Sequence, residues 1–442
     1  MNITDGYRWN VPVVTYGFDS EFINYFGSDG VAAVEEAIAI LNALPPASEI
    51  TLDDYLPETT LLNYEALALG LADLKSAALS ALLEQLGLAE AIRNVWTLRS
   101  RTVLEDGDTN YIVMTRNFDP DSRAPSALVN GVEYSFSIEE FGYPAQADAI
   151  EHALGIPQEA THGVAGSWFS DGKFVSGLTR DDVGGLRFLL SFDNRNIESL
   201  LPGVTSAPGN TNPLVNVALR PGVEKLQFIR MENSSGGFQR TTNVFTDRYF
   251  LDGVLQQQQL QRVIERPDIL FCAKDLGLVS YEWERGTFFF PLIVRRSDTS
   301  AWQNNAVLNE SRSGAGPGTI GPPAEITFGE IGRYALSLLG AYPTPFACWG
   351  IFDESPDGIV AYPGPDTATS VTVSSRVNFD GLTPILEWKL LVRTNVTYRI
   401  ESSNDLQHWQ PAGSILNQAD GFETFSRPLS DGSLFYRAVM TE

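Results

Sequence analysis

The chain has 442 residues, of which 43% are hydrophobic and 11% aromatic, the composition of a folded globular protein rather than a disordered one. Its formal net charge of −25, from 30 basic and 55 acidic residues, argues against a nucleic-acid partner, because no basic surface would offset the repulsion from phosphate. No apolar run reaches the roughly 18–20 residues that cross a bilayer, so we expect no transmembrane segment. The length exceeds one ordinary core, and we expect two to four domains.

The N-terminal segment predicts a strand followed by two helices. Val11–Tyr16 is rich in β-branched residues, which favours a strand. A helix capped by Ser28 or Asp29 is predicted to end before the two prolines that come after it, because proline cannot continue a helix. Asn63 is predicted to cap a second helix that runs through Leu86. Its leucines lie on several sides, so we expect this helix to be buried on most faces or to pack against a partner chain.

Beyond these helices the apolar residues recur with a period of two. Arg99–Leu104 and Tyr111–Phe118 flank a turn of acidic residues and glycine, which predicts a β-hairpin. Asn130-Gly131 is the strongest short hairpin turn and predicts a second one. Helices are then predicted at residues 148–155 and from Thr179 onward.

The segment at residues 148–158, DAIEHALGIPQ, resembles the zinc-binding segment of the metzincin proteases, H-E-x-x-H-x-x-G-x-x-H. In that family three histidines hold zinc and the glutamate acts as the general base. Asp148, His152 and Gln158 take the three ligand positions here, and Ala149 takes the position of the base. The resemblance therefore implies a metzincin-like fold with a degenerate site, in which Asp148, His152 and Gln158 are vestigial positions. We expect no catalytic, cofactor-binding or metal-binding residues.

Two further segments resemble the matrixin branch of the same family, in the same order along the chain. Val13–Asn42 is similar to its opening strand and long helix. Leu178–Leu190, with the sequence LTRDDVGGLRFLL, is similar to the helix that comes after the zinc site. The resemblance covers roughly the first 190 residues. It implies an α+β, matrixin-like N-terminal domain.

Composition divides the chain into three parts. The Pro- and Gly-rich connection Pro202–Pro221 is predicted as the first boundary, which leaves the α+β domain at residues 1–201. Residues 202–370 are predicted to be mostly β, as one domain or two. Residues 371–442 alternate apolar and polar side chains over short segments, which predicts a small antiparallel β-sandwich. Tyr398–Ser414 within it resembles a fibronectin type III-like module of secreted and surface bacterial proteins.

The remaining candidates for a site are cysteines and acidic turns. Cys272 and Cys348 allow at most one internal disulfide, or are two small buried side chains. The run DGDTN at residues 106–110 is similar to the start of a calcium loop, but Asn117 stands where the loop needs glutamate. Ca²⁺ is therefore expected at no particular place, and no other cofactor is expected.

The expected function is reached by elimination. The chain has no phosphate-binding loop and no G-x-S-x-G nucleophile motif. We expect a non-enzymatic extracellular structural or surface protein, either a self-assembling subunit of an appendage, surface layer or matrix, or an adhesin. Its expected partners are other copies of itself or components of the cell surface or matrix. The chain as given has no signal-peptide pattern at its start. The alternative is a secreted hydrolase or carbohydrate-binding protein whose site these motifs do not reveal.

Overall fold

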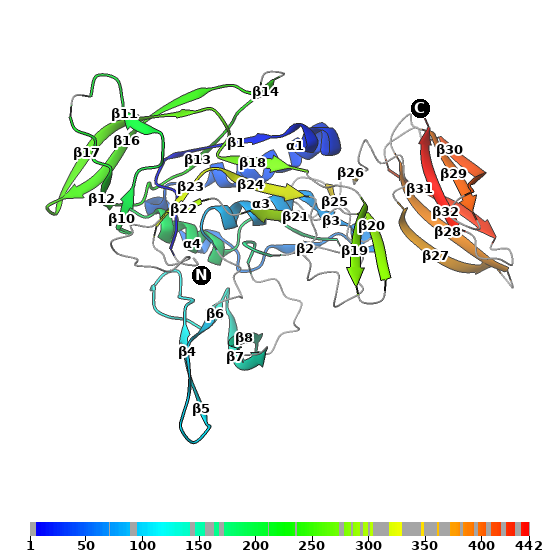
Figure 1. The fold of residues 1–442 in the computed structure, drawn as a ribbon, viewed down its shortest axis with the longest axis horizontal. Coiled ribbons are helices and arrows are strands. Elements are labelled where there is room, and N and C mark those ends of the chain that lie inside the picture. The colour runs from blue at the N-terminus through cyan, green and yellow to red at the C-terminus, as the bar shows by residue number, and fades with distance from the viewer. Residues whose placement is uncertain are drawn as a thin grey trace.

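A computed structural model of the chain describes residues 6–69, 71–88, 95–141, 146–154, 163–167, 172–210, 212–234, 237–273, 278–283, 286–291, 295–298, 301–303, 318–328, 346–348, 360–361, 372–380, 383–392, 397–403, 408–416, 421–428 and 435–441. The fold is mixed and contains more strand than helix, with a mainly parallel sheet and several antiparallel sheets (Figure 1). Within these residues, no helix is long and apolar enough to span a bilayer.

The helices are α1 (Ser20–Ala43), α2 (Tyr64–Leu69), α3 (Leu74–Gln85) and α4 (Arg180–Leu190), with two 3₁₀ turns, η1 (Ala47–Glu49) and η2 (Leu52–Asp54). The first helix begins earlier than predicted, because Asp19 caps it by accepting a hydrogen bond from the Phe22 backbone N–H at 2.6 Å. Gly27, with φ of 64°, interrupts it just before Ser28, the predicted cap. The helix predicted from Thr179 is confirmed, and Thr179 and Asp182 form a capping box at its start.

The second predicted helix is broken into two. Asn63 caps its first part as predicted, since its Oδ1 accepts from the Ala66 N–H at 3.0 Å. The chain then forms the short strand β3 (Ala72–Asp73), and Asp73 caps α3 anew. Burial on most faces is confirmed for α3, in which the described side chains other than Glu84 are buried.

A five-stranded sheet forms the centre of the molecule. Its order is β13-β1-β18-β24-β21, with bounds β1 (Val13–Phe18), β13 (Gln227–Arg230), β18 (Ile269–Cys272), β21 (Arg295–Asp298) and β24 (Ala324–Phe328). The first four strands are parallel to one another, and β21 runs antiparallel at one edge. The predicted strand at Val11–Tyr16 is therefore confirmed as an inner strand of this sheet.

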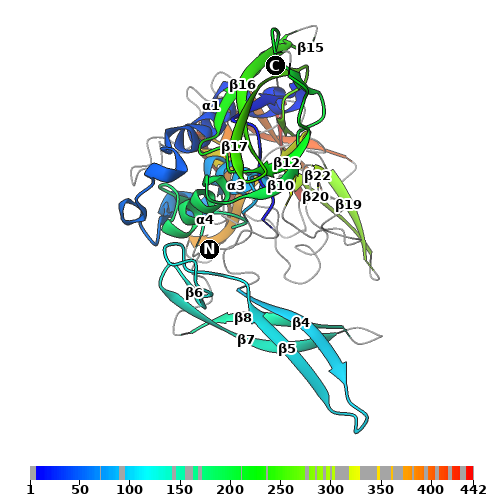
Figure 2. The same ribbon diagram turned by 90° about the vertical axis from the view of Figure 1, so that its left-hand side faces the viewer.

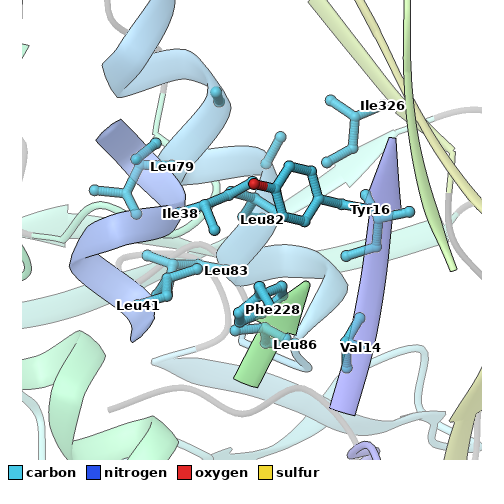
Figure 3. Packing of buried hydrophobic residues seen from close by; sticks show 14 of the residues in the cluster. Val14, Tyr16, Ile38, Leu41, Leu79, Leu82, Leu83, Leu86, Phe228 and Ile326 are labelled. Atoms are coloured by element: carbon cyan, nitrogen blue, oxygen red, sulfur yellow. The ribbon is translucent and has the colours of Figure 1, made fainter. Parts of the chain in front are cut away.

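The hydrophobic core lies between this sheet and the helices α1 and α3. Leu79, Leu82 and Leu83 of α3 meet Ile38 of α1 and Tyr16 of β1 there (Figure 3). An aromatic cluster extends the core across three strands and α1. In it, the rings of Phe18 and Phe271 stack 5.4 Å apart and those of Phe22 and Phe328 lie 5.9 Å apart.

This central sheet crosses the first predicted domain boundary. Val13–Tyr16 of β1 pairs with β13, and Tyr16–Phe18 pairs with β18, so both neighbours of β1 lie beyond residue 201. The same hydrophobic cluster contains residues from Tyr7 to Phe328. The division at residues 201/202 is therefore wrong as a division between two cores. The prediction failed because a Pro- and Gly-rich connection marks a surface loop, and such a loop can also join two parts of one domain.

A second five-stranded sheet is antiparallel and lies beside the first. Its order is β10-β12-β16-β17-β11, with bounds β10 (Asn196–Ser199), β11 (Val204–Ser206), β12 (Val217–Arg220), β16 (Thr241–Leu251) and β17 (Val254–Ile264). We call it the antiparallel sheet. Asp252 and Gly253, with φ of 51° and 78°, form the tight turn between β16 and β17.

A group of strands projects from the body (Figures 1 and 2). It consists of the pair β4 (Trp96–Val103) and β5 (Thr109–Thr115) and of the sheet β6 (Leu128–Val129), β7 (Val132–Phe141) and β8 (Gln146–Ala153). Both predicted hairpins are confirmed: β4 and β5 flank the acidic turn, and Asn130-Gly131, with φ of 46° and 86°, joins β6 to β7.

Further short strands form small sheets of two or three strands. They are β2 (Thr60–Leu62) with β9 (Lys173–Val175), β3 with β25 (Phe346–Cys348) and β26 (Val360–Ala361), β14 (Asn233–Ser234) with β15 (Gly237–Phe238), β19 (Leu278–Trp283) with β20 (Gly286–Pro291), and β22 (Ala301–Gln303) with β23 (Thr319–Gly321). Among the described residues the middle region is thus mostly β, as predicted.

The C-terminal strands form two antiparallel three-stranded sheets, β27-β28-β31 and β30-β29-β32. Their bounds are β27 (Thr372–Asp380), β28 (Thr383–Val392), β29 (Thr397–Ser403), β30 (Gln410–Leu416), β31 (Gly421–Pro428) and β32 (Phe435–Thr441). The predicted antiparallel strands are confirmed, and in the described part of the chain they pair only with one another.

Candidate functional site

The long hairpin β16–β17 has one buried and one exposed face. Its strands are paired without a break from Thr241 opposite Ile264 to Leu251 opposite Val254. Along β16 the side chains of Phe245, Asp247 and Tyr249 are buried, whereas the alternate side chains are exposed or half-buried. Because side chains alternate between the two faces of a strand, the strand register defines which residues share the exposed side.

We call this exposed side the outer face. By register, its side chains are Ile197, Ser199, Thr205, Val217, Leu219, Thr242, Val244, Thr246, Arg248, Phe250, Leu255, Gln257, Gln259, Gln261 and Val263.

Buried ion pairs hold the opposite side of the antiparallel sheet together and join it to the N-terminal segment. Arg220 lies 3.0 Å from Asp247 Oδ1, and Gln258 Nε2 donates to Asp247 Oδ2 at 2.7 Å. Arg8 pairs with Glu198 at 2.8 Å, and both side chains are fully buried. Burial raises the pKa of Glu198, against the opposing effect of Arg8. Arg8 also donates to the backbone carbonyls of Leu189, Asn194 and Arg220. The outer face is therefore a firmly held platform.

The outer face combines apolar and amide side chains. Val244 is 61% exposed, Val217 51% and Leu255 46%. Gln259 Nε2 donates to Thr246 Oγ1 at 2.8 Å across the hairpin, and Gln261 Nε2 donates to Thr205 Oγ1 at 3.2 Å. These cross-strand bonds hold the long amide side chains in place, so less side-chain entropy remains to be lost when another surface covers them.

Charge distinguishes the outer face from the chain as a whole. Arg248 is its one charged residue, although the whole chain carries 55 acidic residues and a net charge of −25. Arg195 lies beside it, with its guanidinium carbon 4.3 Å from the centre of the Phe250 ring. Asp193 and Asp252, in the loop before β10 and in the β16–β17 turn, stand at the rim. A partner that meets this face is not repelled by carboxylates within it.

The segment that resembles a zinc-binding helix is a strand in its described part and not the predicted helix. Residues Gln146–Ala153 form β8, which pairs in antiparallel register with β7, including Asp148 opposite Glu139 and His152 opposite Ser135. On a helix, residues four apart rise about 6 Å, whereas on a strand they are about 13 Å apart. Asp148 and His152 are therefore too far apart along the backbone to share one metal ion. Gln158 lies outside the described residues.

Three residues of this segment are buried or hydrogen-bonded within the protein: Ala149, Glu151 and His152. His152 is exposed, and its Nε2 lies 2.7 Å from Ser137 Oγ. Glu151 Oε1 accepts from the Trp96 backbone N–H at 3.3 Å. Ala149, at the position of the metzincin base, is buried. His162, the next histidine along the chain, lies outside the described residues. The Ser137–His152 pair joins two strands that sequence motifs did not connect.

The acidic turn at residues 106–110 and the carboxylates of Asp119 and Asp121 contact groups of the protein. Asp119 Oδ1 accepts from the Asp121 and Ser122 N–H groups, while Asp121 pairs with Arg180 and Arg187, so protein groups occupy both carboxylates. Asp106 Oδ1 accepts from the Asp108 N–H at 3.1 Å. Within the described ranges, no group of three His, Cys, Asp or Glu side chains is placed to hold a metal ion.

Of the two alternatives for the cysteines, the structure has a thiol and not a disulfide at Cys272. Cys272 of β18 is a fully buried thiol, which confirms the alternative of a small buried side chain for that residue. Cys348 lies in β25, and its side chain is not among those described.

One apolar depression lies between the C-terminal end of α1, α4 and β13. Leu41, Leu44, Leu190 and Phe228 contribute to its lining. Its volume of about 20 Å³ has room for about one water molecule, which is too little for a metabolite. This depression therefore does not serve the hydrolase alternative.

Comparison of the chain with protein-family models, with curated proteins and with solved structures finds no match in any of the three. The candidate site thus rests on geometry. Sequence motifs did not single out Gln257 and Gln259, which belong to the outer face. The period-two alternation of Thr242–Phe250 was the signal that could have revealed a two-sided hairpin.

Proposed function

We propose that this chain is a non-enzymatic protein that associates with further copies of itself, as a structural or surface subunit outside the cell or as an adhesin. The outer face carries the proposal: it is a rigid, partly apolar sheet surface without carboxylates, in a chain of net charge −25. The high net charge keeps the rest of the molecule soluble and apart. Association is therefore concentrated where the carboxylates are missing.

The dimensions of the outer face suit a protein partner. β16 and β17 have 11 residues each, which gives a footprint about 37 Å long at 3.4 Å per residue. Burial of the exposed valine and leucine side chains contributes about 25 cal/mol per Å² of apolar area, and the threonine and glutamine side chains supply hydrogen bonds to a partner. These residues form an open sheet surface, whereas a metabolite binds in a concave pocket.

The finer fold assignments belong to the same proposal. Two three-stranded antiparallel sheets from residues 372–441 support a fibronectin type III-like module at the C-terminus. β1, α1 and α4 agree with the matrixin-like segments at Val13–Asn42 and Leu178–Leu190, whereas β8 does not agree with a zinc helix. A matrixin-like ancestry with a lost zinc site therefore remains our proposal for the N-terminal part.

The test is sedimentation velocity of the whole chain over a wide concentration range, with and without salt and Ca²⁺. Salt screens the general repulsion between acidic copies, so we expect larger species as ionic strength rises. Val244→Glu places a carboxylate in the outer face and should shift the distribution back to monomer. Leu56→Glu, at a position that is 65% exposed and outside the face, is the matched control and should not. A chain that stays monomeric in every condition, or a Val244→Glu variant that associates like its parent, rules the proposal out.

A further inference from the structure

The projecting hairpin β4–β5 ends in a tip of acidic and aliphatic side chains. We define the arm tip as residues 103–108, VLEDGD. Val103 is 55% exposed and Leu104 39%. Glu105, Asp106 and Asp108 are exposed as well. The tip therefore offers carboxylates directly beside apolar surface.

The arm tip is held in one conformation. The Leu104 N–H donates to the Asp108 carbonyl at 2.7 Å, and the Gly107 N–H donates back to the Leu104 carbonyl at 3.0 Å. Gly107 has φ of 92°, which a glycine adopts without strain. At the other end of the hairpin, Trp96 Nε1 donates to the Tyr134 carbonyl at 2.9 Å. Little conformational entropy is lost when such a preformed tip binds.

The outer face has an end that complements this tip. Arg248 is exposed there, and Arg195 lies over Phe250. Phe250 stands opposite both Leu255 and Leu219 in the strand register. We call these five residues the arginine end. Two guanidinium groups beside apolar side chains match the carboxylates and aliphatic side chains of the arm tip.

We propose that the arm tip of one copy docks on the arginine end of the next copy. The inference rests on the proposed function, and it adds the two surfaces that meet. In both views the hairpin β4–β5 points away from the antiparallel sheet, so the two surfaces of one copy do not meet (Figures 1 and 2). Different surfaces that meet between copies form a head-to-tail contact, which grows into a ring or a filament and not only a dimer.

Charge reversal tests this contact by sedimentation velocity at fixed ionic strength, in a condition in which the parent associates. Arg248→Glu and Glu105→Arg should each raise the apparent dissociation constant about tenfold, because each turns an attraction between copies into a repulsion. Glu105→Arg is the sharper of the two, since it lowers the net negative charge and would strengthen association if general repulsion alone mattered. Asp108→Arg repeats that test at a second position of the tip.

Recombining the charges completes the experiment. A one-to-one mixture of Arg248→Glu and Glu105→Arg copies places each reversed residue opposite a complementary one, and association should return to within about threefold of the parent. Arg266→Glu makes the same charge change as Arg248→Glu at an exposed site outside both surfaces. It should raise the apparent dissociation constant only as far as the added net negative charge strengthens the general repulsion between copies. Circular dichroism and denaturant unfolding confirm that each variant folds.

The outcomes separate the two proposals. If the parent associates and Val244→Glu blocks it, but charge reversal acts like Arg266→Glu or the mixture is not restored, the docking of arm tip on arginine end is wrong and the proposed function stands. If the parent does not associate in any condition, both fail.

Discussion

Arg8 and Glu198 show how a single buried pair holds two parts of the molecule together. Arg8 belongs to the N-terminal segment that precedes β1, and Glu198 lies in β10 of the antiparallel sheet. Neither side chain is exposed, and the guanidinium also satisfies three backbone carbonyls. Removing one partner leaves the other as a buried, unpaired charge, which costs more than the pair itself contributes.

We therefore expect Arg8→Met to lower the free energy of unfolding by about 3–5 kcal/mol. Chemical denaturation at pH 7 measures the loss. Arg240→Met is the matched control: the Arg240 side chain is 66% exposed and its contact with Glu265 is 3.9 Å long, so a change within about 0.5 kcal/mol is expected. A loss below about 1 kcal/mol for Arg8→Met would mean that the pair does not anchor the sheet.

The Ser137–His152 pair is the residue-scale test of the hydrolase alternative. A serine nucleophile needs more than the 2.7 Å contact with a histidine: it needs an oriented imidazole and donors for the oxyanion. Both residues lie on the exposed side of a β-hairpin. We expect no labelling of the whole chain by a fluorophosphonate, as judged by intact mass, and the same result for Ser137→Ala. Stoichiometric labelling of the parent that Ser137→Ala abolishes would favour a hydrolase.

At the scale of elements, α3 depends on a buried cap. Asp73 is fully buried, and its Oδ2 accepts from the Ser76 N–H at 2.9 Å and from the Ser76 hydroxyl at 2.6 Å. Burial raises the pKa of Asp73 to about 6, although Lys75 and the Ser76 hydrogen bonds act in the opposite direction. Lys75 in turn lies 3.5 Å from Glu36 of α1. The helix cap thus binds a proton more tightly in the folded chain than in the unfolded one.

The raised pKa of Asp73 makes the free energy of unfolding depend on pH, and the direction of the shift fixes the direction of that dependence. The proton-linked stability from Asp73 is complete below the unfolded pKa, near 3.9, and is lost as the pH rises through about 6. Asp73→Asn keeps a good cap without the ionisation. Relative to the parent, the variant should gain stability between pH 4 and pH 7, up to about 3 kcal/mol at 1.36 kcal/mol per pKa unit. Denaturant unfolding across this pH range measures the difference. Parallel stability curves for the two proteins would contradict the assignment.

At the scale of the molecule, the central sheet makes the first 201 residues dependent on strands that come later in the chain. Both hydrogen-bonded neighbours of β1 lie beyond that point, and so does much of the aromatic cluster. A fragment of residues 1–201 would expose the edges of β1 and the apolar side of α1, which is a hazard for aggregation. We expect it to be insoluble or to unfold without a cooperative transition in circular dichroism, whereas the whole chain unfolds cooperatively. A soluble, cooperative fragment would restore the boundary at 201/202.

The C-terminal module, residues 371–442, should fold without the rest of the chain. The described strands from β27 to β32 pair only among themselves, and their connections are short, so the sheets need no strand from the rest of the chain. We expect residues 371–442 alone to give the circular dichroism spectrum of a β protein, with marginal stability because so short a chain buries little surface. A spectrum of random coil or helix would show that the module depends on the larger part.

Local patterns in the sequence were enough for most of the individual elements. The strand β1, the helix α4 with its capping box, the burial of α3 and the hairpins at residues 105–108 and 130–131 all depend on residues close together in the chain. Turn residues, caps and periodicity act over a few residues, and the printed sequence contains them completely.

The pairing of strands decided the rest. The short segment at residues 146–153 matches a helix motif, but it pairs along its whole length with β7, whose backbone groups need partners. Likewise, only strand pairing placed β13 and β18 beside β1 and β24 beside β18, and only register gathered the outer face from five separate strands. The pairs of β1 with β13 and β18 join residues more than 200 positions apart. A sequence records the preference of each strand but not the choice of its neighbours.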